Sequence, residues 1–222
     1  MTSGSRPGPT HVVWDWNGTL FDDFDLTARI AGRTLAALGV PGVTGEHIRA
    51  TFRRPFSAFY AGLFGRRVTA EEFAFIRERY EEDYAARVFE LSLQTDAFEA
   101  MDLVAAKASQ SLLSMAPDWQ LQQLIDHHGI RGRFVLVEGS LRADSDGNKA
   151  ERMALHLGAV GAEPSGTVVI GDTVDDHDAA VHCGARSVLV TTGSSSRAQL
   201  EATGAPVVDT LHEAVLLALK TS

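Results

Sequence analysis

The sequence has few of the features that mark secreted, membrane-spanning or nucleic-acid-binding proteins. Its single cysteine, Cys183, excludes an internal disulfide framework and a cysteine-rich metal site, and it fits a reducing cytoplasm. No run approaches about 18 apolar residues, so we expect no membrane span. The polar segment 1–10 lacks the apolar stretch of a secretory signal. Basic residues are also in the minority, with 20 Lys and Arg against 29 Asp and Glu.

The acidic balance limits the class of partner. A net charge of −9 argues against non-specific binding to nucleic acid or to an anionic membrane, because phosphate attracts basic surfaces. A small anionic substrate is still compatible, since a metal ion can hold it inside an acidic protein. The 222 residues, 45% of them hydrophobic and 22% charged, predict one large globular domain or a core with a small insert. We expect a cytoplasmic monomer or homodimer.

Short apolar runs recur along the chain, and most are rich in Val, Ile and Leu without alternating polar residues. This pattern is typical of strands that are covered on both faces, as in a parallel sheet. The runs are His11–Trp14, Ser111–Leu113, Phe134–Val137, Thr167–Ile170, Ser187–Val190 and the weaker Pro206–Val208. Helices are expected between the later runs, from Pro117 to His128, from Lys149 to Leu157 before Gly158, and from Asp209 to Lys220. The alternation predicts a doubly wound α/β core.

Residues 23–94 break this alternation and read as helices only. Thr69 and Glu72 have the spacing of a capping box, which starts a helix. The apolar stripes are Leu26, Ile30, Leu35 and Leu38 before Gly39, and then Phe73, Ile76, Tyr80, Tyr84 and Val88. We therefore expect an all-helical cap domain, 23–94, inserted after the first strand of a core made of 1–22 and 95–222. Because open α/β sheets bind ligands at the carboxyl ends of their strands, the insert is interpreted as a lid over such a site.

The first strand is followed by a turn with unusual chemistry. Asp15 comes directly after the buried run, and Asn17, Gly18 and Thr19 follow it. Glycine allows a sharp turn, and the amides of such a turn can face a bound anion as phosphate-binding loops do. Gly18 and Thr19 are therefore candidate substrate-binding residues. Taken alone, the same residues also fit an ordinary strand followed by an Asn-Gly turn.

A cluster of acidic residues follows the fourth apolar run. Asp172, Asp175, Asp176 and Asp178 lie just past Ile170, where their carboxylates would repel one another unless a cation lay among them. Oxygen ligands of this kind suit Mg²⁺. The alternative is a solvated acidic helix N-terminus, which the helix dipole favours. That alternative explains Asp175 and Asp178 better than Asp172, which lies against the strand.

Four separated motifs, in this order along the chain, resemble those of the haloacid dehalogenase superfamily of phosphohydrolases. They are Trp14–Leu20, Ser111–Ser114, Lys149 ahead of a helix, and Gly171–Thr173 with Asp176. The likeness covers nearly the whole chain. The helical insert after the first motif is similar to the smaller type of cap in this superfamily. The layout is most similar to that of the phosphoglycolate phosphatase and β-phosphoglucomutase group.

The resemblance implies a Mg²⁺-dependent phosphatase that acts on a small phosphorylated metabolite. Asp15 would attack phosphorus and form an aspartyl-phosphate, which divides one difficult step into two. Lys149 would neutralise the phosphoryl oxygens and the nucleophile, and Ser114 would donate a hydrogen bond to the same group. The residues implied to bind Mg²⁺ are Asp15, Asn17 through its backbone carbonyl, Asp172, and Asp176 either directly or through water.

Two adjacent arginines in the insert are candidate specificity residues. Arg53 and Arg54 precede Pro55 and fall where related caps place their substrate loop. Guanidinium groups there could bind a carboxylate or a second phosphate of the substrate in bidentate fashion. The alternative interpretation is a solvated basic turn.

Position 17 departs from the pattern of the superfamily. Its phosphatases usually carry a second aspartate two residues after the nucleophile, which protonates the leaving group and then activates water. Asn17 stands there instead, and an amide neither gives up nor takes a proton at neutral pH. A phosphate- or metabolite-binding protein with impaired turnover is therefore an alternative, and a phosphotransferase or mutase is another. The dehalogenase branch needs no acidic metal site, so Asp172 and Asp176 count against it.

Overall fold

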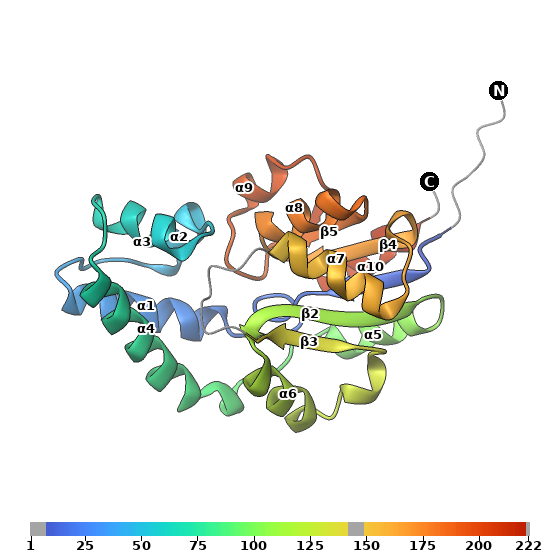
Figure 1. Ribbon diagram of the computed structural model, residues 1–222, viewed down its shortest axis with the longest axis horizontal. Coiled ribbons are helices and arrows are strands. Elements are labelled where there is room, and N and C mark those ends of the chain that lie inside the picture. Colours follow the sequence, from blue (N-terminus) through green and yellow to red (C-terminus); the bar gives the residue numbers. More distant parts are fainter. Residues whose placement is uncertain (1–7, 142–148, 221–222) are drawn as a thin grey trace.

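The structure is a computed structural model that describes residues 8–141 and 149–220, and its centre is a six-stranded, all-parallel sheet (Figure 1). The strands are β1 (His11–Trp14), β2 (Ser109–Pro117), β3 (Val137–Ser140), β4 (Thr167–Gly171), β5 (Arg186–Val190) and β6 (Val207–Val208). Their order is β3-β2-β1-β4-β5-β6, so the direction of winding reverses between β1 and β4. The predicted doubly wound sheet is confirmed. The carboxyl ends of β1 and β4 lie at the switch point where such folds bind ligands.

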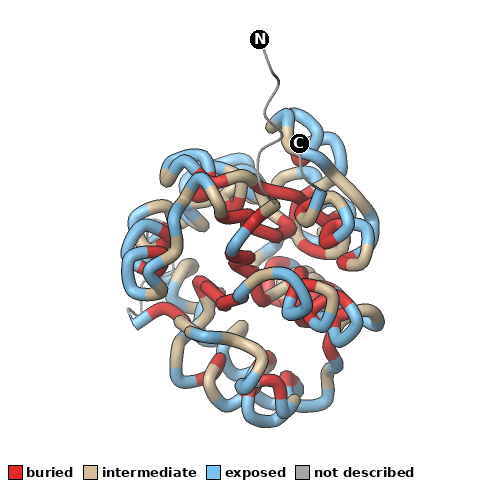
Figure 2. Tube along the Cα trace, turned by 90° about the vertical axis from the view of Figure 1, so that its right-hand side faces the viewer, coloured by how far each residue is buried: buried red, intermediate tan, exposed pale blue. Residues whose placement is uncertain are grey.

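Helices cover both faces of the sheet, because alternate side chains of each buried strand point to opposite sides. On one face, Val12 and Trp14 pack with apolar residues of α5 (Ala97–Ala105), α6 (Asp118–His127) and α10 (Leu211–Ala218). On the other face, Val13 packs with residues of α7 (Lys149–Val160) and α8 (Val174–Cys183). Figure 2 shows the buried residues along the strands in the middle of the molecule and the exposed residues on the helices around them.

The segment between β1 and β2 is helical, and Figure 1 shows its first four helices beside the sheet. These helices are α1 (Phe24–Ala37), α2 (Gly45–Thr51), α3 (Phe56–Phe64) and α4 (Ala70–Ala85), and the short η1 (Val88–Glu90) follows them before α5. A small apolar cluster centred on Phe24, Ile48 and Phe59 joins α1, α2 and α3. The division of the chain into a core and a cap domain stays a prediction, and residues 1–7 of the predicted core segment lie outside the described residues.

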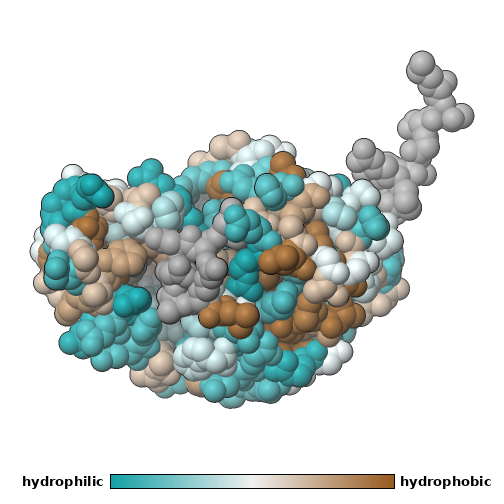
Figure 3. All heavy atoms as spheres, viewed as in Figure 1, coloured by the Kyte–Doolittle hydropathy of each residue, from teal (hydrophilic) through white to brown (hydrophobic). Residues whose placement is uncertain are grey.

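Helix α4 has two contrasting faces. It begins at the predicted capping box, in which the Thr69 hydroxyl accepts from the Glu72 amide and the Glu72 carboxylate accepts from the Thr69 amide. Figure 3 shows a hydrophilic surface over the outward side of this helix. Two aromatic residues of α4 face other parts of the chain, since Phe73 packs against Tyr60 of α3 and the Tyr84 hydroxyl donates to Asp23 before α1. No helix in the described ranges is both long and apolar enough to cross a membrane.

Several predicted boundaries differ from the structure, among them those of β2, which extends beyond the run Ser111–Leu113, and of α10, which is shorter than Asp209–Lys220. Val88 does not extend α4, which ends at Ala85, but is buried in the main core from the short η1. Helix α7 continues through Gly158 to Val160 and ends before Gly161, whose φ of +71° suits glycine. The apolar run 134–137 overlaps β3 only at Val137, although the two residues before it already exchange backbone hydrogen bonds with β2.

Candidate active site

Carboxylates from three places in the sequence meet at the carboxyl ends of β1 and β4. The two strands are neighbours, and the amide of Asp15 donates to the carbonyl of Ile170 at 2.9 Å. Asp15 and Asp172 therefore extend from adjacent strand ends, and Asp176 follows in the first turn of α8. One oxygen from each of the three lies within 4.8 Å of the others, and all three residues are buried.

Two glycines make room for these carboxylates. A Cβ atom on Gly193 would lie 1.9 Å from Oδ2 of Asp172, and one on Gly171 would lie 2.2 Å from Cγ of Asp176. Real side chains do not approach so closely, so any larger residue would displace the carboxylate it meets. The amide of Ser194, directly after the first of these glycines, donates to Oδ2 of Asp172 at 2.7 Å.

Lys149 is the cation of this cluster. It is the first residue of α7, it is only 6% exposed, and its Nζ donates to Oδ1 of Asp15 and to Oδ1 of Asp176. Burial alone would lower the pKa of Lys149, but the two carboxylates outweigh it and hold the pKa above its usual value. Asp176 is held from its other oxygen by the amide and hydroxyl of Thr173, at 3.0 and 2.6 Å. Lys149 thus links α7 to the ends of β1 and β4.

The charges of the cluster do not cancel. Three carboxylates surround one ammonium group, and burial raises the pKa of Asp15 to about 7, with Lys149 opposing and Asp176 adding to the rise. Burial, Asp15 and Asp176 together also raise the pKa of Asp172 well above its usual value. A hard cation among these oxygens would relieve the repulsion that adds to the effect of burial on both pKa values. The donor set, composed of carboxylate oxygens, fits Mg²⁺.

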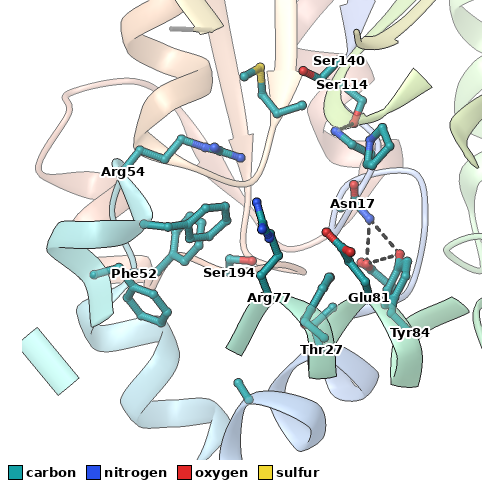
Figure 4. A pocket seen from close by; sticks show the side chains of 18 of the residues that line it. Asn17, Thr27, Phe52, Arg54, Arg77, Glu81, Tyr84, Ser114, Ser140 and Ser194 are labelled. Atoms are coloured by element: carbon teal, nitrogen blue, oxygen red, sulfur yellow. Dashed lines mark hydrogen bonds between the residues drawn. The ribbon is translucent and has the colours of Figure 1, made fainter. Parts of the chain in front are cut away.

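The side chain of Asn17 is bonded to residues at the start of α1 and in α4. Its Nδ2 donates to Oδ2 of Asp23 at 2.7 Å and to the hydroxyl of Tyr84 at 3.0 Å, and the Tyr84 hydroxyl donates to the same Asp23 oxygen at 2.8 Å (Figure 4). Burial raises the pKa of Asp23, while these hydrogen bonds oppose the rise. The side chain at the position of the missing acid therefore joins the turn after β1 to α4.

The other predicted residues of the turn are engaged within the protein. The amide of Gly18 donates to Asp23 and to the carbonyl of Phe21, and the Thr19 amide donates to the carbonyl of Trp16. The Thr19 hydroxyl donates to Asp172 at 3.0 Å. Neither Gly18 nor Thr19 is among the cavity-lining residues of the described ranges. Their predicted role in substrate binding stays a prediction.

A cavity of about 810 Å³ lies between the strand ends and the helices that follow β1 (Figure 4). The predicted site residues that line it are Asp15, Asn17, Ser114, Lys149, Asp172 and Arg54. Ser114 lies in β2 where the pairing with β3 changes register, and its Oγ accepts from the amide of Ala116 at 3.0 Å. Predicted site residues from five separate segments of the chain thus face one space.

The two predicted arginines separate. The Nε of Arg54 lies 3.2 Å from Oδ2 of Asp175, which brings this guanidinium to the cavity beside α8. Arg53 is exposed, donates to the carbonyl of Ala58 at 3.2 Å, and is not among the described lining residues. One sequence motif therefore supplies only one lining residue.

Several residues of the site were not found from the sequence. Asp23, Tyr84, Gly193 and Ser194 all contact the predicted residues directly. Tyr84 was recognised as part of an apolar helix face, but a helical period does not tell which partner that face meets. Gly193 and Ser194 follow β5, and only the order of strands in the sheet brings their loop to Asp172.

Comparisons with known proteins agree with the predicted fold. Residues 148–214 match the model of the HAD-hydrolase-like family. No curated protein matches the chain. Among solved structures, a predicted phosphatase from Clostridium acetobutylicum superimposes with a TM-score of 0.81 at 17% identity, covering 96% of this chain and 99% of its own.

Two further structures are similar over nearly their whole length. A haloacid dehalogenase-like family protein from Streptococcus pneumoniae has a TM-score of 0.79 at 20% identity, with 96% and 99% of the two chains covered. A predicted phosphoglycolate phosphatase from Haemophilus somnus has a TM-score of 0.74 at 16% identity, with 94% and 97% covered. The predicted likeness is confirmed, by the family model over residues 148–214 and by the fold over nearly the whole chain.

Proposed function

From the haloacid dehalogenase-like fold of this chain, we propose that the protein is a Mg²⁺-dependent phosphatase that hydrolyses a small phosphorylated metabolite through an aspartyl-phosphate. The observation that carries the proposal is the contact of Lys149 with both Asp15 and Asp176, beside Asp172, at the switch point of the sheet. A carboxylate beside a buried cation at one end of the cavity supports this proposal, because phosphoryl transfer needs a positioned nucleophile and fixed positive charge.

In the first half-reaction, an oxygen of Asp15 forms a bond to phosphorus while the bond from phosphorus to the leaving-group oxygen breaks. Lys149 holds the nucleophile in place and offsets the negative charge of the phosphoryl oxygens. The hydroxyl of Ser114, at the wall of the same cavity, is available to donate to one of them. In the second half-reaction, water attacks phosphorus, inorganic phosphate leaves, and the carboxylate of Asp15 is restored.

The residues that would hold Mg²⁺ are Asp15, Asp172 and the backbone carbonyl of Asn17, with Asp176 as a direct ligand or as a partner of its waters. Bound there, the ion would screen the repulsion between the carboxylate and the phosphate dianion. Asp176 is already held by Lys149 and by Thr173. This favours a role for Asp176 in positioning the lysine and the start of α8.

The position of Asn17 favours one alternative, a protein that binds a phosphorylated metabolite with impaired turnover. Its amide carries no transferable proton, and it is turned towards Asp23 and Tyr84. General acid–base catalysis is typically worth about 10²–10⁴-fold, so hydrolysis of esters with poor leaving groups would be slow. The alternative differs from the proposal in turnover and not in binding.

The test uses acetyl phosphate and p-nitrophenyl phosphate, whose leaving groups need little protonation. We expect release of inorganic phosphate from both with Mg²⁺, and loss of release when the metal is chelated. Acid quenching during turnover should trap a phosphorylated peptide that contains Asp15. Binding of both esters without turnover would favour the alternative. If the protein neither binds nor hydrolyses either ester, the proposal is overturned.

A further inference from the structure

The end of the cavity opposite the carboxylates is aromatic. The rings that line it come from α3, α4 and the loop before α3, and they are Phe52, Phe56, Phe59, Tyr60, Phe73 and Tyr80. They touch one another in sequence, with centroid distances of 5.5 Å for Phe52 and Phe59, 5.0 Å for Phe59 and Tyr60, and 5.9 Å for Tyr60 and Phe73. The helical part of the lining therefore contains a group of packed aromatic rings, which we call the aromatic wall.

The same wall has no surplus of positive charge for a remote anion. In the described lining, the loop before α3 contributes Arg54, and α4 contributes Arg77, Glu81 and Glu82. Figure 4 shows Arg77 and Glu81 rising side by side from α4 into the cavity. Arg54 already pairs with Asp175 of α8. A second carboxylate or phosphate on the substrate would therefore meet as many carboxylates as guanidinium groups among these four residues.

The size of the cavity also favours a substrate with an apolar group over a small, highly charged one. Its volume of about 810 Å³ lies within the range of roughly 300–1,000 Å³ that holds whole organic ligands. A two-carbon acid such as glycolate would leave most of the aromatic wall in contact with water. Trp119, the first-turn residue of α6, lines the same cavity although it is 62% exposed, which adds an aromatic surface on the core side.

Asn17 restricts the leaving group independently of the wall. Without a proton donor the leaving oxygen must depart as an anion. A phenol has a pKa of about 10, several units below the 15.7 of water, so a phenolate leaves without the proton that an alkoxide needs. The residue at position 17 and the aromatic wall therefore select for the same feature of a substrate.

We infer that the substrate is a small aryl phosphate, with its ring against the aromatic wall and its phosphoryl group at Asp15. This inference rests on the proposed phosphatase function and adds the substrate class to it. The bond from Asp15 to phosphorus forms as the bond from phosphorus to the phenolic oxygen breaks. The phenolate leaves with the electron pair and takes a proton from solvent. Water then releases inorganic phosphate and restores Asp15.

The first test compares substrates on the unaltered protein with Mg²⁺ present. Phenyl phosphate and 2-naphthyl phosphate have similar leaving groups but different apolar area, so their KM values report on the wall. We expect KM for 2-naphthyl phosphate to be about 10-fold lower than for phenyl phosphate, and phosphoglycolate to be a poor substrate. Equal KM values for the two aryl esters, or a preference for phosphoglycolate, would overturn the inference.

A matched pair of variants on α4 tests whether the preference for a larger aryl group comes from the aromatic wall. Phe73 lines the cavity, whereas Phe75, two residues along the same helix, does not. Phe73→Ala should lower the ratio of kcat/KM for 2-naphthyl phosphate over that for acetyl phosphate by about 5-fold or more, and Phe75→Ala should leave the ratio unchanged. The same ratio in both variants would count against the wall. Competitive inhibition of the unaltered protein by 2-naphthol, but not by glycolate, tests the wall even if Phe73→Ala does not fold.

Further arms separate this inference from the function on which it rests. Acetyl phosphate reports on phosphoryl transfer without an aryl group, so its hydrolysis together with equal KM values for both aryl esters would overturn the substrate class alone. If no ester is turned over, the inference is tested by thermal shift. 2-Naphthyl phosphate must then raise Tm more than inorganic phosphate does, and an equal rise overturns the inference.

A phosphotyrosine peptide should be a poorer substrate than 2-naphthyl phosphate. A better turnover of the peptide would overturn the small-molecule class of substrate.

Discussion

The two ends of the cavity are built on different principles. At the sheet end, directed hydrogen bonds and ion pairs hold the buried carboxylates, as in Asp172 between the hydroxyl of Thr19 and the amide of Ser194. At the helical end, aromatic rings pack on one another, and few directed contacts fix them. The sheet end is thus suited to a chemistry that requires exact positions. The helical end is suited to selecting a ligand by its apolar area, and it tolerates changes that the sheet end does not.

The largest effect is expected from the proposed nucleophile. Asp15→Asn keeps the volume of the side chain but replaces a carboxylate with a poor nucleophile, so turnover of acetyl phosphate should fall to below about 1%. Initial rates with saturating Mg²⁺ measure this, with circular dichroism to show that the fold is retained. Asp178→Asn, at an exposed position of α8, is the matched control and should keep its activity. Turnover above that level in Asp15→Asn would remove Asp15 as the nucleophile.

The crowding of the sheet end is tested by a pair of glycines. Gly193→Ala would place a Cβ 1.9 Å from the Asp172 carboxylate, and we expect the free energy of unfolding to fall by roughly 1–3 kcal/mol. Gly158→Ala, in the interior of α7 with nothing within 4 Å, should raise it by roughly 0.5–1 kcal/mol. Urea unfolding of both variants gives the comparison. A neutral Gly193→Ala would mean that the carboxylate has room to move.

The boundary between the two ends is tested by exchanging an amide and a carboxylate. Asn17→Asp alone would set a second carboxylate 2.7 Å from Asp23, which would repel it or take up a proton. The double variant Asn17→Asp/Asp23→Asn keeps the hydrogen bond with its direction reversed. It should raise the turnover of alkyl phosphates such as phosphoglycolate by about 10-fold or more, since the missing acid is restored.

The single variant should gain less than the double variant with alkyl phosphates, and single-turnover kinetics should show a smaller gain for p-nitrophenyl phosphate. The Asp23→Asn variant is the control for loss of the buried carboxylate. If neither variant gains on any alkyl phosphate at saturating Mg²⁺, position 17 is not where the missing acid belongs.

The smallest effect is expected at the two arginines. Arg54→Ala removes the cation that faces the cavity beside Asp175, and KM for every phosphate ester should rise a few-fold. Arg53→Ala, at an exposed position outside the described lining, should leave KM within about 2-fold. Steady-state kinetics with acetyl and phenyl phosphate measure KM for the two variants and show which arginine contributes to substrate binding. A rise in KM from Arg53→Ala and none from Arg54→Ala would reverse the assignment.

The strands and the sheet-end residues could be predicted because their signals are local and agree with one another. Asp15 and Asp172 each follow an unbroken apolar run, and the carboxyl ends of parallel strands meet at one edge of a sheet. Lys149 could be placed only through the order of the motifs, since a lysine before a helix is common. The residues that support them, such as Asp23 and Gly193, carry no local pattern and were not found.

At the helical end of the cavity, the sequence predicted the apolar face of a helix but not what that face contacts. The apolar stripe that includes Phe73, Tyr80 and Tyr84 was visible in the sequence, because side chains three or four residues apart share one face of a helix. Whether that face meets a core, a partner or a cavity depends on how the helix lies against the rest of the chain. The structure places it against the cavity, where the ring of Phe73 lies 5.9 Å from that of Tyr60 in α3.

The sequence by itself determined the class of fold, the all-helical segment after the first strand, and the acidic residues that meet at the strand ends. These follow from periodicity and from the geometry of parallel sheets, which act over a few residues at a time. Only the tertiary structure decided that Asn17 bonds to Asp23 and Tyr84, that Arg54 and not Arg53 lines the cavity, and that the wall opposite Asp15 is aromatic. The physical reason is that these contacts join residues distant in sequence, and packing of whole elements, rather than local preference, brings them together.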